Sequence, residues 1–184
     1  SLDTDQRFER VNPALALRYA VTPTITLDAA IAQTSRAPSA IELGCADPES
    51  PCRLPNALAG DPPLAQVVAR TVEGGINANI GRITARIGAF RTVSSNDILF
   101  VADDTAGFGY FRNFGRTRRQ GFDVDLTATF GSVRLSGHYT FLDATYRSAE
   151  TVGGAANSSA DHAAPGFEGE IAIDKGDRIP LIPR

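Results

Sequence analysis

The stretch that decides the fold is residues 120–146, QGFDVDLTATFGSVRLSGHYTFLDATY. Apolar and polar residues alternate through residues 122–130, and the alternation resumes over residues 133–141 after a Gly131-Ser132 turn. A period of two places successive side chains on opposite faces of a β-strand. The stretch therefore predicts a long antiparallel hairpin with one apolar face and one polar face.

The same pattern occurs twice more toward the N-terminus. One pair of alternating segments covers about residues 8–21 and 24–32 and turns at Pro23, and a second pair covers residues 68–80 and 83–92 and turns at Gly81-Arg82. A shorter alternation over residues 167–174 predicts a small extra strand. The sequence thus predicts an all-β fold of antiparallel up-and-down hairpins with about six long strands.

The connections between these segments alternate in length. Long loops are predicted over residues 35–66, 94–113 and 147–184 of a single unit spanning residues 1–184. Within the first loop, residues 63–70 have a second interpretation as a short helix, because a proline precedes an amphipathic pattern. In an up-and-down sheet every tight turn then lies at one end and every long loop at the other. Outer-membrane β-barrels show this asymmetry.

Composition and charge exclude some classes of function. A net charge of -3 and a sequence pI near 5.4 argue against nucleic acid as a partner, because phosphate backbones are bound through concentrated Lys and Arg.

No run of eighteen apolar residues occurs, so no transmembrane helix is predicted. The chain contains no methionine, and we expect it to be an excised portion of a longer polypeptide.

The two cysteines lie close together in the first long loop. Cys45 and Cys52 enclose a polar segment with two prolines, which predicts a local disulfide in an oxidising compartment. The alternative is a pair of free thiols. A metal site is less favoured, because no His or further Cys lies nearby to complete a tetrahedral set.

Catalytic chemistry has little support in this sequence. Ser136, His138 and Asp143 could be drawn as a triad, but residues two apart on one strand point the same way and do not converge on a substrate. Asp123 and Asp125 are better interpreted as two solvated carboxylates on the polar strand face than as an acid–base pair. The sequence predicts no enzyme, no cofactor and no metal site.

Short motifs carry a family resemblance. Residues 34–43, TSRAPSAIEL, resemble the FRAP…EL segment of TonB-dependent outer-membrane receptors, with Ser35 where that family often has Phe. The residues that match this motif are Arg36, Ala37, Pro38, Glu42 and Leu43. Residues 61–76 are similar to the family segment NPDLKPE…YELG, although Ala65-Gln66-Val67 replaces its Lys-Pro-Glu portion.

The resemblance continues to the end of the chain. Asn113 and Gly115 match the N-x-G element, Gly121 begins a segment like G-x-E, and residues 176–184 resemble GNRLPxxPRH. Asn96-Asp97-Ile98-Leu99 resembles the family's D-x-I element, which lies between the second and third of these matches. Each match is short, but six of them occur in the family's order across most of the chain. The chain is identified on these residues as resembling the late part of a TonB-dependent receptor.

This resemblance implies a partial segment of a 22-stranded transmembrane β-barrel in the outer membrane of a Gram-negative bacterium. It implies import of a scarce small-molecule ligand such as a ferric siderophore, driven by TonB through an N-terminal part absent from this chain. Outer-membrane lipid would surround the apolar rows. Six strands are too few to close a barrel, so an isolated segment is expected to self-associate or to require membrane or detergent.

Ligand recognition is predicted in the long loops, because loops on a rigid scaffold carry binding residues. The strongest candidates are Phe108, Tyr110, Phe111 and Arg112, which combine aromatic faces with a cation suited to an anionic chelate. The alternative for these side chains is that they only pack the loop or lie at the membrane interface. The alternative for the whole chain is a secreted soluble β-sandwich, either an adhesin or a carbohydrate-binding module, whose apolar rows would be buried between two sheets.

Overall fold

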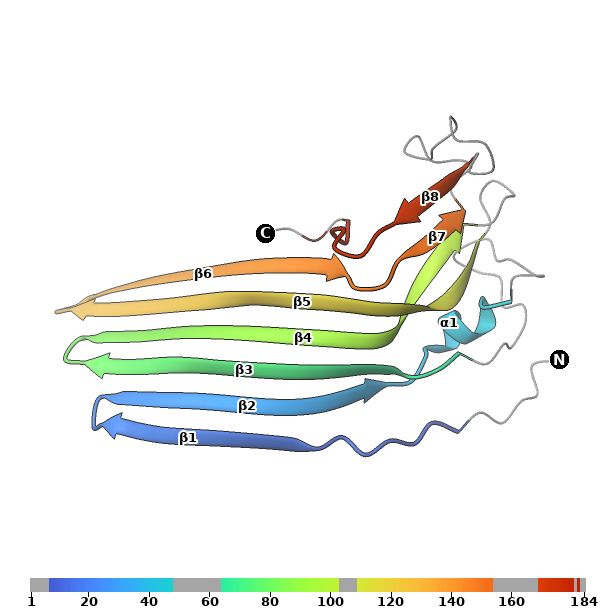
Figure 1. The fold of residues 1–184 in the computed structure, drawn as a ribbon. Coiled ribbons are helices and arrows are strands. Elements are labelled where there is room, and N and C mark those ends of the chain that lie inside the picture. The colour runs from blue at the N-terminus through green and yellow to red at the C-terminus, as the bar shows by residue number, and fades with distance from the viewer. Residues whose placement is uncertain (1–6, 48–63, 103–108, 154–168, 181, 183–184) are drawn as a thin grey trace.

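The computed structural model describes residues 7–47, 64–102, 109–153, 169–180 and 182. In these ranges six strands form one sheet in chain order, and two shorter strands form a separate sheet. All the pairings are antiparallel. The six-stranded sheet is therefore an up-and-down meander (Figure 1), and the predicted all-β class is confirmed.

The elements differ widely in length. In chain order they are β1 Ala14–Thr22, β2 Ile25–Arg36, α1 Ala40–Gly44, β3 Val67–Ile80, β4 Ile83–Ala102, β5 Gly109–Phe130, β6 Val133–Tyr146, β7 Glu150–Gly153 and β8 Glu170–Ile173. The longest strands, β4 and β5, have 20 and 22 residues. Strands of this length exceed the usual 3–10 residues and reach well beyond a hydrocarbon layer about 30 Å thick.

The three predicted tight turns are confirmed at one end of the sheet. They connect β1 to β2 at Pro23-Thr24, β3 to β4 at Gly81-Arg82 and β5 to β6 at Gly131-Ser132. Gly81 and Gly131 have φ of 61° and 59°, which glycine adopts without a steric penalty. Two-residue loops of this kind match the twist of the strands that they join. The other connections leave from the opposite end (Figure 1).

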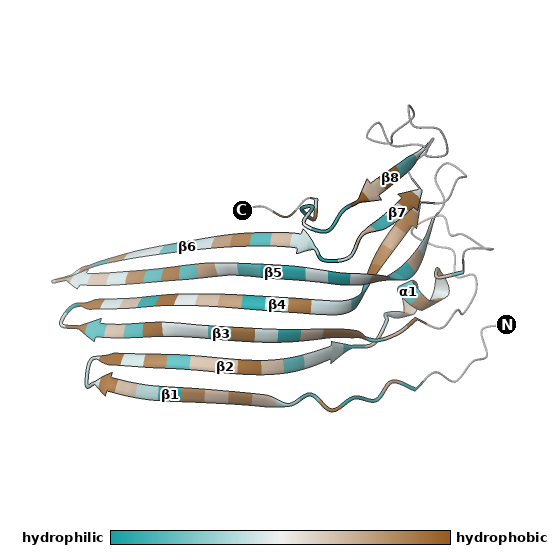
Figure 2. Cartoon of the chain, viewed as in Figure 1, coloured by the Kyte–Doolittle hydropathy of each residue, from teal (hydrophilic) through white to brown (hydrophobic). Residues whose placement is uncertain are grey.

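One face of the sheet is apolar and open. A row across the sheet is formed by residues paired in register, among them Tyr19, Leu27, Ile76, Ile87 and Tyr139. These five residues are 39% to 62% exposed, and Figure 2 shows the alternation of brown and teal along the strands. Among the described residues no second sheet covers this face. The row therefore contradicts the sandwich alternative, in which it would be buried.

The register of the hairpins gives the sheet a tilt. Ile25 of β2 pairs with Ala78, and β3 continues two residues further to Ile80. Ile83 of β4 pairs with Ala128, and β5 continues two residues to Phe130. Each hairpin is thus displaced along the strand direction by two residues relative to the hairpin before it, which is about one residue per strand. With about 3.4 Å per residue and about 4.8 Å between strands, this displacement corresponds to a strand tilt of about 35° from the barrel axis. That tilt lies in the range for closed barrels.

The predicted loop over residues 94–113 is wrong for most of its length. β4 continues to Ala102 and β5 begins at Gly109, so strand pairing covers much of this segment. Asn96 has a positive φ of 54° within β4, which interrupts the alternation that would have revealed the strand. Residues 98–102 are all apolar, so a period of two carries no signal there.

The first loop contains a short helix that the alternation did not reveal. Ser39 caps α1, and its side chain and that of Glu42 bond reciprocally to the backbone in a capping box. The helix alternative for residues 63–70 is wrong from Val67 onward, where β3 begins. β8 confirms the small strand predicted over residues 167–174, whereas β7 was not predicted. Among the described residues no helix is long and apolar enough to cross a membrane.

The buried residues gather at the loop end of the sheet. Phe114 and Thr117 of β5 and Ala144 of β6 are each 1% exposed. The rings of Phe114 and Tyr146 lie 5.0 Å apart between centroids. A tail segment also joins the edge of β6 here, because the amide of Tyr146 donates to the carbonyl of Asp177 at 2.8 Å. The loop end is therefore the packed part of the described structure.

Candidate functional site

The face opposite the apolar rows carries a continuous set of polar side chains. Arg18 pairs in register with Asp28, and the row continues through two glycines to Asp123 and Thr140. The alternation of each strand places these side chains away from the apolar face. If the sheet is part of a barrel, this face lines the lumen.

Two glycines leave room for the carboxylates of this row. Gly75 and Gly88 are directly paired between β3 and β4. A Cβ on Gly75 would lie 3.2 Å from Oδ2 of Asp28, and one on Gly88 would lie 2.9 Å from Oδ1 of Asp123. The two carboxylates thus lie over the glycines from opposite sides. Asp123 also lies 4.0 Å from Nε of Arg86, which balances one negative charge.

A histidine joins two polar residues in the neighbouring row. Nδ1 of His138 lies 2.6 Å from Oδ1 of Asp125, and its Nε2 lies 2.8 Å from Oγ1 of Thr140. The Asp125 and His138 side chains are 50% and 61% exposed. Both ring nitrogens are therefore engaged by neighbours on an open wall. Asp143 was the third member of the triad considered from the sequence, but its carboxylate lies 3.7 Å from Arg118. Ser136, His138 and Asp143 therefore do not form one site.

The loop end has a second polar cluster, which the sequence reasoning missed. Oδ2 of Asp97 accepts a hydrogen bond from Oγ1 of Thr117 at 2.7 Å and lies 3.6 Å from Nη1 of Arg119. Asp97 belongs to β4, and Thr117 and Arg119 belong to β5. Thr117 is buried, so its hydroxyl requires this acceptor. The cluster fixes the pairing of the two strands beyond the apolar rows.

Asn113 has a clear structural role among the motif residues. Its Oδ1 accepts from the amide of Ala65 at 2.7 Å, and its Nδ2 donates to the carbonyls of Ala65 and Asn96, both at 3.0 Å. The side-chain amide thus hydrogen-bonds to the backbone just before β3 in the way that the backbone of a neighbouring strand would. Its placement explains why an asparagine, with one donor group and one acceptor, fits this position.

The two motif glycines lie where the chain approaches itself. A Cβ on Gly115 would lie 2.3 Å from Oγ of Ser148, and one on Gly121 would lie 2.0 Å from the carbonyl oxygen of Phe141. Ser148 in turn accepts from the amide of Arg116 at 3.0 Å. Both positions therefore exclude a side chain for steric reasons.

The remaining motif residues surround α1. Arg36 makes a bidentate contact with Glu42, at 2.6 Å and 2.9 Å. Burial raises the pKa of Glu42, but hydrogen bonds from Arg36 and Ser39 outweigh it and hold this pKa below its ordinary value. The other three motif residues differ in exposure: Ala37 is exposed, Pro38 is buried and Leu43 is intermediate. The motif thus secures the turn from β2 into α1.

The predicted ligand-binding residues lie at the start of β5, apart from Phe108, which is outside the described residues. Phe111 packs on the edge of Phe100 at 5.1 Å, and its amide donates to the carbonyl of Cys45 at 2.6 Å. Arg112 contacts Glu150 at 2.6 Å. Tyr110 is partly exposed. Part of this cluster therefore packs the protein, and its contact with a ligand stays a prediction.

The predicted disulfide also stays a prediction. Cys45 follows α1 and is 2% exposed, but Cys52 lies outside the described residues. Thiol labelling under non-reducing, denaturing conditions tests the pairing, because modification of both cysteines would contradict it. Among the described residues no group of three or more His, Cys, Asp or Glu side chains is placed to hold a metal ion.

An antiparallel meander with one open apolar face, one polar face and a tilt of about 35° defines an arc of a closed β-barrel wall. The sequence matches the family described as TonB dependent receptor-like, beta-barrel, over residues 1–184. The chain therefore belongs to that family, and the resemblance drawn from the motifs is confirmed.

Solved structures with the same fold include three iron-related proteins. The siderophore receptor PirA from Pseudomonas aeruginosa has a TM-score of 0.61 at 18% identity, over 77% of this chain and 29% of that chain. PirA from Acinetobacter baumannii has a TM-score of 0.54 at 17% identity, over 73% and 23%. The FrpB iron transporter from Neisseria meningitidis (F3-3 variant) has a TM-score of 0.54 at 16% identity, over 73% and 19%. The chain thus spans less than a third of each of these structures.

Proposed function

We propose that this chain forms part of the wall of a receptor in the outer membrane of a Gram-negative bacterium. The receptor would import an iron chelate such as a ferric siderophore, with energy supplied through TonB. The observation that carries this proposal is the division of the sheet into an exposed apolar face and a polar face at a barrel-like tilt. Such a face is stable in contact with lipid and costly in water.

The polar face suits a water-filled lumen. Asp28, Asp123 and Asp125 each have a polar neighbour there, and none is deeply buried. Charged side chains on the wall of a water-filled lumen stay hydrated, so they carry no desolvation cost there. We therefore assign this face to the interior of the receptor and not to a catalytic site.

Iron chelates are favoured as ligands for two reasons. The similar structures comprise an iron transporter and two siderophore receptors. The start of β5 also presents Arg112, whose guanidinium pairs with Glu150 and is partly exposed. An anionic chelate would pair with this guanidinium if it displaced Glu150.

The test uses the full receptor that contains this chain, in cells from which its gene can be deleted. Deletion should abolish uptake of radioactive iron supplied as one ferric chelate from a panel, and expression of the wild-type gene should restore it. Uptake of every chelate at the wild-type rate in the deletion strain, with the receptor normally expressed in the parent, would contradict the proposal.

Variants then test the predicted ligand cluster. Tyr110→Ala combined with Arg112→Ala should weaken chelate binding, whereas Glu150→Gln should strengthen the binding of an anionic chelate by releasing the arginine. Arg82→Ala, at the opposite end of the sheet, is the matched control. Unchanged affinity in the double variant, with correct insertion, would remove this cluster from the binding site.

A further inference from the structure

Four arginines lie on the apolar face just beyond its apolar rows. Arg91 pairs in register with Val72, so it shares the face and the row of exposed apolar residues. One row nearer the loop end, Arg70 and Arg118 flank Val93 on neighbouring strands. In the same row Arg178 pairs with Thr145, which is the partner of Arg118. We refer to Arg70, Arg91, Arg118 and Arg178 as the arginine belt.

The spacing of the belt allows several arginines to reach one ligand. With about 4.8 Å between strands and about 3.4 Å per residue, the Cα of Arg91 lies about 8 Å from those of Arg70 and Arg118. Arginine side chains are long enough to converge over that distance. The guanidinium fork also matches the oxygens of a phosphate group.

The belt has more positive charge than its neighbours neutralise. Arg118 lies 3.7 Å from Asp143, while Arg70 donates at 3.1 Å to Gln33, which is uncharged. Nε of Arg118 is buried with no partner among the described residues. In the same ranges no hydrogen bond or ion pair engages the side chain of Arg91 or Arg178. Among the described residues, one carboxylate thus lies within ion-pair distance of one of the four cations, and an anion from outside the protein would complete the balance.

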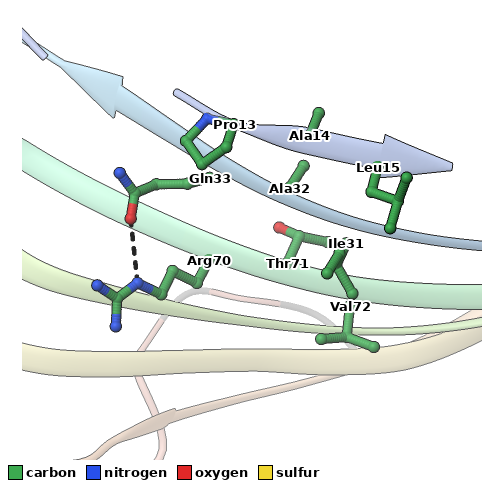
Figure 3. A pocket seen from close by; sticks show the side chains of 9 residues that line it. All are labelled: Pro13, Ala14, Leu15, Ile31, Ala32, Gln33, Arg70, Thr71 and Val72. Atoms are coloured by element: carbon green, nitrogen blue, oxygen red, sulfur yellow. Dashed lines mark hydrogen bonds between the residues drawn. The ribbon is translucent and has the colours of Figure 1, made fainter. Parts of the chain in front are cut away.

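An apolar groove adjoins the belt. It has a volume of about 390 Å³ and is lined by Pro13, Leu15, Ile31 and Val72, with Arg70 and Gln33 also on its wall. Figure 3 shows Arg70 and Gln33 at one end of the groove and the larger apolar side chains toward the other. A groove with an apolar body and a cationic end suits a molecule that has an acyl chain and an anionic head.

We propose that the arginine belt binds the phosphorylated headgroup of a lipid in the leaflet on the loop side, with an acyl chain of that lipid along the groove. The belt lies where the apolar rows end, which is the depth of the headgroups if those rows face lipid. Arginine near a phosphate-bearing surface gains electrostatic free energy and bidentate hydrogen bonds. The inference rests on the proposed membrane wall and does not depend on the imported ligand.

The test titrates the detergent-purified, delipidated receptor with phosphatidic acid and follows the bound lipid by native mass spectrometry. Phosphatidylcholine serves as the zwitterionic reference. The belt variant combines Arg70→Gln, Arg91→Gln and Arg178→Gln and leaves the Arg118 contact with Asp143 intact. The matched control combines Arg18→Gln, Arg82→Gln and Arg134→Gln, three exposed arginines away from the belt. Arg91→Gln alone removes an exposed side chain without a described partner, so it tests the proposal even if the triple variant fails to assemble.

Each belt arginine is expected to contribute roughly fivefold to the affinity, so the belt variant should bind phosphatidic acid about 100-fold more weakly and Arg91→Gln about fivefold more weakly. The control should retain wild-type affinity, and millimolar inorganic phosphate should not displace the lipid. Equal affinity in the wild type and Arg91→Gln, an equal loss in the control, or full displacement by phosphate would overturn the proposal. Each of these results would leave iron uptake by the wild-type receptor unchanged, so failure here is distinguishable from failure of the proposed function.

Discussion

The turn-end half and the loop-end half of the sheet differ in where their side chains find partners. Toward the turns, apolar residues such as Ile76 and Leu126 are about half exposed, at 49% and 50%. Toward the loops, Phe114 and Tyr146 are buried against one another. The turn-end half therefore exposes its apolar side chains to the surroundings of the protein, whereas the loop-end half packs against other parts of the chain. In our account the surroundings of the turn-end half are lipid.

The largest expected effect comes from placing a charge in the middle of the apolar rows. Ile87→Arg should destabilise the inserted receptor by about 2–4 kcal/mol, because arginine near the bilayer midplane loses hydration. Thr84→Arg lies on the same strand and on the polar face, so it should change stability little. Equilibrium folding in lipid vesicles measures both, and an equal cost at the two positions would contradict the assignment of the faces.

The next effect concerns backbone packing where the two halves meet. Gly121→Ala would bring a Cβ within 2.0 Å of the carbonyl oxygen of Phe141, so the strands must shift, at a cost of about 1–3 kcal/mol. Gly137→Ala is the matched control, because nothing lies within 4 Å of its Cβ position. Denaturant midpoints in detergent compare the two variants. A similar midpoint for both would show that the close approach at Gly121 has little weight.

A smaller effect is expected at the loop end. Asn113→Ala removes the hydrogen bonds to Ala65 and Asn96 and should cost about 1–2 kcal/mol. The segment near Ala65 should then become more sensitive to protease, whereas the turn end should not. Asn79→Ala, an exposed asparagine near a turn, provides the control. Protection near Ala65 that survives Asn113→Ala would mean that other contacts hold this segment.

The smallest effect depends on pH. The lowered pKa of Glu42 means that its contact with Arg36 stabilises α1 above the ordinary carboxyl pKa and is lost as pH falls through the lowered value. Because the Arg36 side chain is 51% exposed, the contribution should be below about 1 kcal/mol. Hydrogen exchange at the Leu43 amide, corrected for intrinsic rate, should show a loss of protection in acid. Glu42→Gln should remove that pH dependence, and a variant that keeps it would point to another group.

The turn-end half could be predicted from the sequence because its signal is local. The period of two, together with the turns at Gly81 and Gly131, defined the hairpins and their faces. The loop-end half could not be predicted in this way, since its partners are distant in sequence: Asn113 bonds to Ala65, and Phe114 packs on Tyr146. The backbone at Asn96 also concealed the continuation of β4.

The motif residues were found by resemblance, but their roles came from the structure. The contact of Arg36 with Glu42 was not expected from the sequence. The capping box from Ser39 to Glu42 could have revealed α1, because the spacing S-x-x-E is a known start signal. The contact of Asp97 with Thr117 had no comparable signal. A long loop thus predicts where such contacts form but not which residues make them.

The central claim is that the apolar rows face lipid and the polar rows face water. Spin labels on single cysteines at Ile76 and Asn77, neighbours on opposite faces of β3, test it most directly in the vesicle-inserted receptor, with Cys45 and Cys52 replaced by Ser if they prove reactive. Our account predicts that power saturation finds the label at position 76 more accessible to oxygen and the label at position 77 more accessible to a water-soluble nickel chelate. Equal accessibilities at the two positions, or the reverse order, would contradict it.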